Sequence, residues 1–427
     1  MKKSHNYKVT VLSRNAFAVN GSTLYAVDFC NCLARFGFDV TLVSLKQPDF
    51  SCQKITSNSS KVKWRTPGYI QIGQYLFSTN YKRWIYFIRL KISTQFTNHF
   101  RFLRFLRNCR DRIAKSFGHK DDVIIQDNKK DDHFIYTKSE CSWVSKTIHD
   151  IAPQFIVFDF IDTIPLMAQL QNLKNNVRIC LAHDIFHRRP SSAISGFQLA
   201  AIITKGKELA YFNKMSAVIT IQDEEASYLK SCKINPAVFS IPFSIMAFRD
   251  NAVNARRPVR HQLLFIGNHS DHNEIGLKWF IRNVFPLLRE KASDYQLICC
   301  GSVCGTIDKS QLVPGIYLCG IVNDLSKYYM QSSCTIVPLL FGSGLKTKLM
   351  ESLANSCPVV STSIGVQGIQ KPERYGIVVA DHPREFAEAI HMLEGKKELT
   401  REEKMAFELD FSPEKIYQPL LSFLKKD

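Results

Sequence analysis

The residues best suited to chemistry lie at 335–369, where a glycine turn precedes a lysine and a glutamate in TIVPLLFGSGLKTKLMESLANSCPVVSTSIGVQGI. Gly344, Lys348 and Glu351 are four and three residues apart, so a helix over residues 345–354 would place them on one face. Free backbone N–H groups and the helix dipole at a glycine-rich helix start favour an anion such as a pyrophosphate. A carboxylate farther along that face suits hydrogen bonds from vicinal hydroxyls. The combination predicts a nucleotide site.

Apolar runs before and after the glycine turn and the predicted helix indicate the strands that flank them. Residues 335–340 and 357–362 are typical of short buried strands, so the whole stretch predicts one βαβ unit. A second face of the predicted helix is apolar and consists of Leu345, Leu349 and Leu353. The spacing alone leaves another interpretation open, in which Lys348 and Glu351 form a solvated surface pair on an ordinary βαβ crossover.

The stretch follows the pattern P-L-x-F-G-S-G-x-K-x-K-x-x-E-x-x-A-x-x-x-P-V-V-S-T-x-x-G-x-x-G, and LLFIGN at 263–268 and GIVNDLSKYY at 320–329 precede it. Together these residues resemble the donor-binding signature of the retaining glycosyltransferases of family 4 (group 1), which have the GT-B fold. The resemblance is strong over residues 263–369 and weak before residue 177.

This resemblance implies an α/β protein with two Rossmann-like domains that face each other across a cleft, and a C-terminal helix that crosses back to the first domain. We expect an acceptor-side domain at 1–250, a nucleotide-sugar-binding domain at 260–405 and the cross-over helix at 406–427. A length of 427 residues agrees with two separate cores.

The remaining pattern predicts strands and helices that alternate on both sides of an arginine-rich linker at 246–261. Strands are expected at 7–12, 39–45, 154–160, 177–184, 217–221, 239–243, 263–268, 296–302, 315–324 and 375–380. Helices are expected at 23–36, 139–151, 165–173, 199–213 and 383–393, and a last helix begins with Ser412 as N-cap and Pro413 at its first position.

The family resemblance also assigns roles to residues of the site. It implies His183 and Lys348 as catalytic residues. It implies donor contacts from Gly342, Ser343, Gly344, Lys346, Glu351, Val322 and Asn268, with the glycine amides and lysines on the diphosphate and Glu351 on the ribose. Because Lys346 lies about 200° from Lys348 on an ideal helix, its side chain is expected to point elsewhere and to serve as a control.

Two positions depart from the family pattern. Ser343 stands where the first of two glutamates is expected, and Asn268 stands where many relatives have an arginine. Many relatives also have a phosphate-binding lysine a few residues after that arginine, whereas the first lysine after Asn268 in this sequence is Lys278. Lys346 and Lys348 are therefore expected to supply the missing positive charge. The sequence has no Asp-x-Asp metal motif, and we expect neither a metal nor a cofactor besides the nucleotide-sugar donor.

His183 is the best catalytic candidate in the N-terminal half because it ends the predicted strand VRICLAHD, and ligands gather at the carboxyl ends of such strands. A histidine bonded to backbone is the ordinary interpretation of such a residue, whereas the resemblance places it against the donor sugar. Gly21, Arg188 and Arg189 are weaker candidates on the acceptor side. Glu208 is expected at the surface.

Composition limits the remaining possibilities. No apolar run is long enough to span a membrane, and the N-terminus has no apolar core of signal-peptide length, so we expect a cytoplasmic protein. Five of the thirteen cysteines lie in or beside strand-like runs and are expected in the core: Cys180, Cys299, Cys300, Cys319 and Cys334. The cysteine spacing does not favour zinc.

The net charge of +18 predicts an anionic partner or surface. Residues 81–120 carry eleven Lys or Arg and one acidic residue, interleaved with aromatic residues. Arg101, Arg104, Arg107 and Arg110 recur every three residues. The segment is either a peripheral contact with anionic membrane or an acidic glycan, or a solvated helix. No reader motif supports nucleic acid.

The predicted function is transfer of a sugar from a nucleotide diphospho-sugar to a glycan or lipid-linked acceptor, with retention of configuration and without a metal, in cell-surface polysaccharide or glycolipid synthesis. Two alternatives stay open. The first is a non-catalytic GT-B-fold binding protein that uses a basic face on an anionic polymer or membrane. The second is a sugar-nucleotide epimerase of the same fold, for which the sequence shows no additional set of carboxylates.

Overall fold

A computed structural model of the chain describes residues 7–17, 21–47, 52–54, 61–72, 75–79, 136–170, 175–188, 203–251, 256–308, 312–322, 324–342 and 344–425. The chain divides into two compact units, Met1–Val19 with Phe29–Leu181 and Asn20–Asp28 with Ala182–Asp427. The domain boundaries expected at 250 and 260 stay predictions. The segment 81–120 lies outside the described residues.

The first unit is built on parallel strands β1 (Lys8–Ser13), β2 (Asp39–Ser44), β4 (Lys63–Arg65), β7 (Phe155–Asp159) and β8 (Val177–Ala182). Strand β1 lies between β2 and β7, with Val9 opposite both Val40 and Phe155. Most of these strand residues are buried, as expected for a parallel sheet covered on both faces. The first unit also contains helix α4 (Lys138–Ile151), which a capping box of Thr137 and Glu140 begins. Helix α1 (Gly21–Arg35) has residues in both units.

A small antiparallel sheet in the first unit was not predicted. It has the order β3-β6-β5, with β3 at Cys52–Lys54, β5 at Tyr69–Ile72 and β6 at Tyr75–Ser78. Its strands are three or four residues long, which is too short for a clear alternation signal in the sequence.

In the second unit, β9 (Ala217–Thr220) and β10 (Ala237–Ser240) are parallel and complete a seven-stranded sheet of order β10-β9-β8-β7-β1-β2-β4. Helices α5 (Lys205–Phe212) and α6 (Asp223–Ser231) alternate with these strands.

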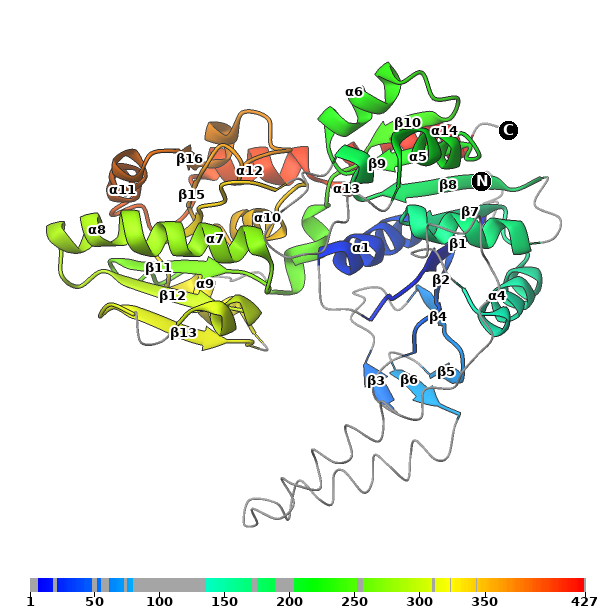
Figure 1. The fold of residues 1–427 in the computed structure, drawn as a ribbon, viewed down its shortest axis with the longest axis horizontal. Helices are drawn as coiled ribbons and strands as arrows, with labels where there is room; N and C mark the ends of the chain where they lie inside the picture. The colour runs from blue at the N-terminus through cyan, green and yellow to red at the C-terminus, as the bar shows by residue number, and fades with distance from the viewer. Residues whose placement is uncertain are drawn as a thin grey trace, which may run out of the picture. The chain divides into compact units, whose positions relative to one another are not determined.

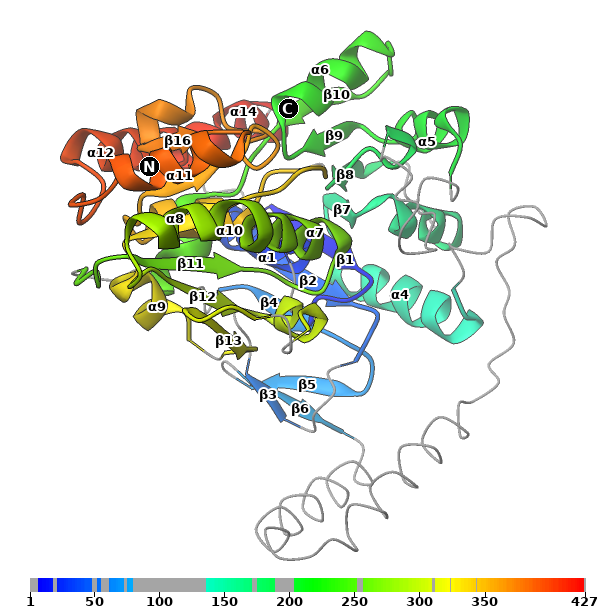
Figure 2. The ribbon, with the colours of Figure 1, turned by 60° about the vertical axis from the view of Figure 1, so that its left-hand side comes forward.

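The rest of the second unit is a six-stranded parallel sheet of order β13-β12-β11-β14-β15-β16. Its strands are β11 (Gln262–Ile266), β12 (Gln296–Cys300), β13 (Ile316–Gly320), β14 (Cys334–Val337), β15 (Val359–Ser361) and β16 (Ile377–Val379). Its helices are α7 (Asp271–Trp279), α8 (Phe285–Lys291), α9 (Ser326–Gln331), α10 (Thr347–Ala354), α11 (Pro383–Met392) and α12 (Arg401–Asp410). The strand order runs outward from β11 in both directions, as in a Rossmann sheet. The predicted α/β class with two Rossmann-like sheets is confirmed (Figures 1 and 2).

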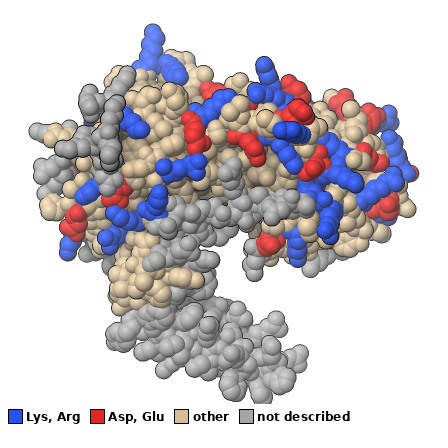
Figure 3. All heavy atoms as spheres, turned by 180° about the vertical axis from the view of Figure 1, so that it is seen from behind, with Lys and Arg blue, Asp and Glu red and all other residues tan. Residues whose placement is uncertain are grey.

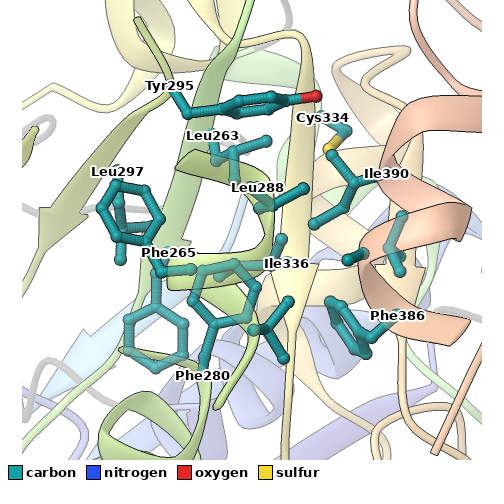
Figure 4. Packing of buried hydrophobic residues seen from close by; sticks show 14 of the residues in the cluster. Leu263, Phe265, Phe280, Leu288, Tyr295, Leu297, Cys334, Ile336, Phe386 and Ile390 are labelled. Carbon is teal, nitrogen blue, oxygen red and sulfur yellow. The ribbon is translucent and has the colours of Figure 1, made fainter. Parts of the chain in front are cut away.

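Helices α7 and α8 lie along one face of the six-stranded sheet and form a core with it (Figure 1). A π-helical turn at Phe280–Val284 joins the two helices, and Pro286 stands in the first turn of α8, where its missing N–H is tolerated. Phe280 contacts Phe386 of α11 with ring centroids 5.7 Å apart (Figure 4). This core packs against the sheet whose strands lead into the loops described below.

The C-terminal segment returns to the seven-stranded sheet, as expected, but its helical structure differs from the prediction. The single predicted helix is two short ones, α13 (Pro413–Ile416) and α14 (Gln418–Leu424), because Pro419 lacks the N–H that would continue the first. Phe423 of α14 packs on Phe239 of β10, with ring centroids 5.4 Å apart. Strand β10 belongs to the seven-stranded sheet.

Two other predictions were wrong in detail, on the helix at 165–173 and on the burial of Cys319. The helix expected at 165–173 is a 3₁₀ helix at Ile161–Gln169, where Pro165 inside the segment disfavours α-helical bonding. The end of the linker is anchored, since the Arg256 guanidinium donates hydrogen bonds to backbone carbonyls including those of Tyr329 and Lys397. Cys319 is exposed because a bulge interrupts the pairing of β13 at that point.

Charged side chains of both signs are mixed on one face of the molecule. On the face shown in Figure 3, Lys and Arg side chains mingle with Asp and Glu and do not gather in one patch. Within the described residues, no helix has the length and apolar character needed to cross a bilayer.

Candidate functional site

The site lies at the point where the six-stranded sheet reverses its strand order. Strands β11 and β14 are parallel neighbours, with Leu263 opposite Cys334, although they are separated in sequence by β12 and β13. Ligands of doubly wound sheets bind beside the carboxyl ends of such a strand pair. The loops that leave these two ends contain Gly267 and Asn268 after β11, and Gly342 and Gly344 after β14.

Glycine is required on the β14 loop by its backbone conformation. Gly342 has φ of +123° and Gly344 has φ of +82°, which other residues rarely adopt. On the neighbouring helix, a Cβ at Gly276 would lie 2.5 Å from the Pro338 carbonyl oxygen, so α7 packs directly on the chain between β14 and this loop. Ser343 lies outside the described residues.

Helix α10 begins later than predicted. It starts at Thr347 and not at residue 345, with Lys346 in an extended conformation at the N-cap. Gly344 is therefore outside the helix and does not share a helical face with Lys348 and Glu351. Lys348 lies in the first turn, close to the unpaired backbone N–H groups.

Lys348 is buried, which excludes the interpretation of a solvated surface pair. Its side chain donates a hydrogen bond to the Asn273 side-chain carbonyl, and its Nζ lies 4.5 Å from the centre of the Phe265 ring. Neither of these two partners carries a negative charge. Burial, followed by the nearby charge of Lys346, lowers the pKa of Lys348 to about 7.

Asn273 connects Lys348 to Asn268, the residue at the family's arginine position. The Asn273 amide nitrogen donates to the Asn268 side-chain oxygen at 2.6 Å and to the Asn268 carbonyl at 3.1 Å. Lys348 therefore brings a positive charge next to the loop that lacks the expected arginine and lysine. The role predicted for Lys346 and Lys348, to supply the missing charge, stays a prediction, and Lys348 is placed beside this loop.

Lys346 does not point away from the site, and the prediction that it can serve as a control was wrong. It is buried, and its Nζ donates to the Gly344 carbonyl at 2.6 Å. Burial lowers the pKa of Lys346 to about 8, although Asp184 and Glu225 act in the opposite direction. The physical reason is that Lys346 precedes the helix, so the 100° rotation per helical residue does not apply to it.

His272 belongs to this cluster and was missed. It stands in the first turn of α7, and its Nε2 lies 3.2 Å from the Ser270 hydroxyl. Burial and the charges of Lys348 and Lys346 lower the pKa of His272 to about 4, so its ring is neutral at pH 7. The only signal in the sequence was its place at a helix start just after the β11 strand.

Glu351 lies about one turn into α10, near Tyr329 of α9. Burial raises the pKa of the Glu351 carboxyl to about 7, and the nearby Tyr329 hydroxyl opposes that shift. Val322, in the loop after β13, is partly buried and packs beside Tyr329 with the small cluster around Leu264 and Cys300. The backbone contact with a base that we predicted for Val322 is not tested by these positions.

His183 directly follows β8, as predicted, and is buried. Its ring meets the Tyr25 ring edge-on with centroids 5.1 Å apart, and the Tyr25 hydroxyl donates to the Ile241 carbonyl at 2.7 Å. The next residue, Asp184, lies near the loop that follows β14, since a Cβ at Gly344 would be 3.6 Å from the Asp184 Oδ1. Gly21 begins α1, where an added Cβ would meet Thr347 at 3.0 Å.

Glu208 was expected at the surface but is fully buried. Its carboxylate accepts hydrogen bonds from the backbone N–H groups of Phe186 and His187, each at 2.9 Å, and lies 2.6 Å from His187 Nδ1. It therefore fixes the loop that follows His183. Arg188 is exposed, with its guanidinium 4.3 Å from the centre of the Tyr228 ring, and Arg189 lies outside the described residues.

Comparison with known proteins gives a partial sequence match. Residues 260–394 match the family model described as Glycosyl transferases group 1. A protein of Klebsiella pneumoniae, described as an uncharacterized 44.6 kDa protein in the cps region, is 28% identical over 155 residues. That match covers 34% of this chain and 39% of the Klebsiella protein.

Solved structures match over nearly the whole length. TarM has a TM-score of 0.64 at 11% identity, with all of both chains covered. Sucrose-phosphate synthase from Thermosynechococcus elongatus has a TM-score of 0.62 at 13% identity, with 98% of both chains covered. HepE from Anabaena, solved with UDP and glucose, has a TM-score of 0.56 at 10% identity over 99% of this chain and 100% of its own. The chain therefore has the two-domain GT-B fold, and its residues 260–394 are similar to the glycosyl transferases of group 1.

Proposed function

We propose that this protein is a glycosyltransferase that transfers a sugar from a nucleotide diphospho-sugar to a glycan or lipid-linked acceptor with retention of configuration. The observation that carries the proposal is the pair of buried lysines, Lys346 and Lys348, at the switch point of the six-stranded sheet. Burial lowers the pKa of both, and the Lys348 ammonium group contacts an amide oxygen and an aromatic ring, neither of which carries a negative charge. A diphosphate at this point would supply that charge.

In this proposal each group has one task. The Gly342 and Gly344 amides and both lysines hold the diphosphate, and Glu351 accepts hydrogen bonds from the ribose. Negative charge grows on the diphosphate as the glycosidic bond breaks, so Lys348 stabilises the transition state more than the ground state. Because two lysines supply this charge, we propose that the reaction needs no added metal.

The comparisons support the choice of substrates. UDP is present in the solved structure of HepE with glucose, and a TarM variant from S. aureus was solved with fondaparinux, alpha-GlcNAc-glycerol and UDP. The Klebsiella relative is described as lying in a cps region. We therefore propose a UDP-sugar donor and a role in polysaccharide or glycolipid synthesis, carried out in the cytoplasm.

A hydrolysis screen tests the proposal, since many transferases slowly transfer their sugar to water. Purified protein is incubated with UDP-, GDP- and ADP-sugars, with and without EDTA, and the release of nucleoside diphosphate is measured. We expect release from at least one donor, unchanged by EDTA and reduced in Lys348→Ala. Lys278→Ala is the matched control, because Lys278 pairs with Glu274 on the neighbouring α7.

Calorimetry with the same nucleoside diphosphates separates the enzyme from the alternatives. A binding protein for anionic polymers alone would give no heat with any of them, and this outcome would exclude a donor site. Conversion of a UDP-sugar into its epimer without loss of UDP would instead identify an epimerase.

A further inference from the structure

The outer face of strands β5 and β6 of the antiparallel sheet is apolar. Ile70 lies opposite Phe77 and Ile72 opposite Tyr75 in the β5–β6 register, so these side chains share one face. The rings of Tyr75 and Phe77 are 6.2 Å apart along that face. An antiparallel sheet with one solvated face normally presents polar residues there.

The exposure of these side chains alternates along each strand. Ile70, Ile72 and Tyr75 are 51%, 61% and 43% exposed, whereas Leu76 and Ser78, on the inner face, are buried. Gln71 also belongs to the inner face, where its side chain accepts a hydrogen bond from the Trp64 backbone N–H of β4. The sheet is therefore fixed to the first unit by one face and presents three large apolar side chains on the other.

The sequence around this face is basic. Residues 50–79 contain four Lys or Arg and no Asp or Glu, and residues 81–120 add eleven basic residues against one acidic residue. A second copy of the chain on this face would bring two basic stretches together. Anionic headgroups would instead neutralise them, and their acyl boundary would accept the isoleucines.

We propose that the outer face of β5 and β6 docks on an anionic phospholipid surface, with Ile70, Ile72 and Tyr75 inserted at the headgroup boundary. The inference goes beyond the proposed sugar transfer and does not depend on it. It assigns an apolar contact to described residues, separate from the charge contributed by the sequence that follows.

Vesicle sedimentation of the full chain tests this docking face. The probes are vesicles of phosphatidylcholine alone and of phosphatidylcholine with phosphatidylglycerol. We expect binding only to the anionic vesicles, reduced about tenfold or more in the double variant Ile70→Ser, Ile72→Ser, because two half-exposed isoleucines would lose their burial in lipid. Release of nucleoside diphosphate in solution should be unchanged.

The matched control is Met405→Ser with Leu409→Ser, a pair of apolar side chains on α12 that are 58% and 61% exposed. Full binding by this control supports the proposal, and an equal loss in both double variants would overturn it. Equal binding to both kinds of vesicle, or none to either, would also overturn it. So would a wild-type dimer that the Ile70 and Ile72 changes dissociate in sedimentation velocity, since that would identify a second copy as the occupant.

Discussion

In two polar clusters of the second unit, the pKa shifts favour opposite forms of the titratable side chains, uncharged in one cluster and charged in the other. In the cluster at the strand-order reversal, burial shifts the pKa values of Lys346, Lys348, His272 and Glu351 toward the uncharged forms. In the second cluster, at the end of α11, burial also acts to raise the pKa of Glu394. There, hydrogen bonds from Tyr295 and His391 and the charges of His261 and His391 outweigh burial and lower that pKa to about 2.

The hydrogen bonds explain this difference. Glu394 Oε1 accepts from the Tyr295 hydroxyl at 2.5 Å and lies 2.8 Å from His391 Nδ1 and 3.3 Å from His261 Nε2. Lys348 has an amide oxygen and an aromatic ring. A charged group with hydrogen-bonding and oppositely charged partners stabilises the fold. A buried charge without such partners destabilises the ligand-free protein and favours binding of an oppositely charged ligand.

The variant Lys348→Ala tests most directly whether the buried charge at the strand-order reversal acts on a diphosphate, and we expect it to have the largest effect. Loss of a cation that acts on the leaving diphosphate should lower turnover about a hundredfold or more and affect donor affinity less. Steady-state kinetics on the donor found by the screen gives both values, with Lys278→Ala as control. Equal, small effects of the two changes would remove Lys348 from the reaction.

Glu351→Ala should have the next largest effect. Two ribose hydroxyls would lose an ionised acceptor, and charge-assisted hydrogen bonds contribute roughly 1.5 to 3 kcal/mol, so we expect about a tenfold to hundredfold loss of nucleoside diphosphate affinity. Calorimetry measures this loss. An unchanged affinity in a folded variant would contradict the ribose assignment.

The pKa values sharpen the comparison through the pH dependence of binding. Below about pH 7 Glu351 gains a proton and loses its charge as an acceptor, and above about pH 7 Lys348 loses its proton. Diphosphate affinity should therefore peak near pH 7 and fall by up to about tenfold per pH unit on each side.

Two conservative variants assign the two limbs of that profile. Glu351→Gln should flatten the acidic limb. Lys348→Arg should shift the alkaline limb upward to about pH 8, because arginine keeps its proton and Lys346 then loses its own. Titration calorimetry at several pH values follows both. A profile that neither change alters would mean that other groups control binding.

The smallest expected effects are on stability, and they have opposite signs for the two clusters. Glu394 has a lowered pKa, so its contribution is present above about pH 4.5 and is lost as the pH falls toward 2. Glu394→Gln should lower the free energy of unfolding by roughly 1 kcal/mol at pH 7, with the difference disappearing at low pH.

Lys348→Met should raise the melting temperature of the protein without ligand. The lowered pKa of Lys348 means that its protonated form destabilises the fold, so the gain should be largest below pH 7. Thermal melts at pH 3, 5 and 7 compare both variants. A loss of stability in Lys348→Met would show that its charge is well compensated after all.

The sequence by itself determined the parallel α/β sheets and the amphipathic site helix, because apolar periodicity and glycine turns are local signals. Only the tertiary structure decided which charges are buried. Asn273 and Lys348 are 75 residues apart, and their hydrogen bond depends on the adjacency of β11 and β14, which no local pattern contains. Glu208 likewise reads as a surface residue, yet it is buried because the loop at Phe186 and His187 folds over it. Lys346 lies one residue before the helix, so helical periodicity gave it the wrong direction.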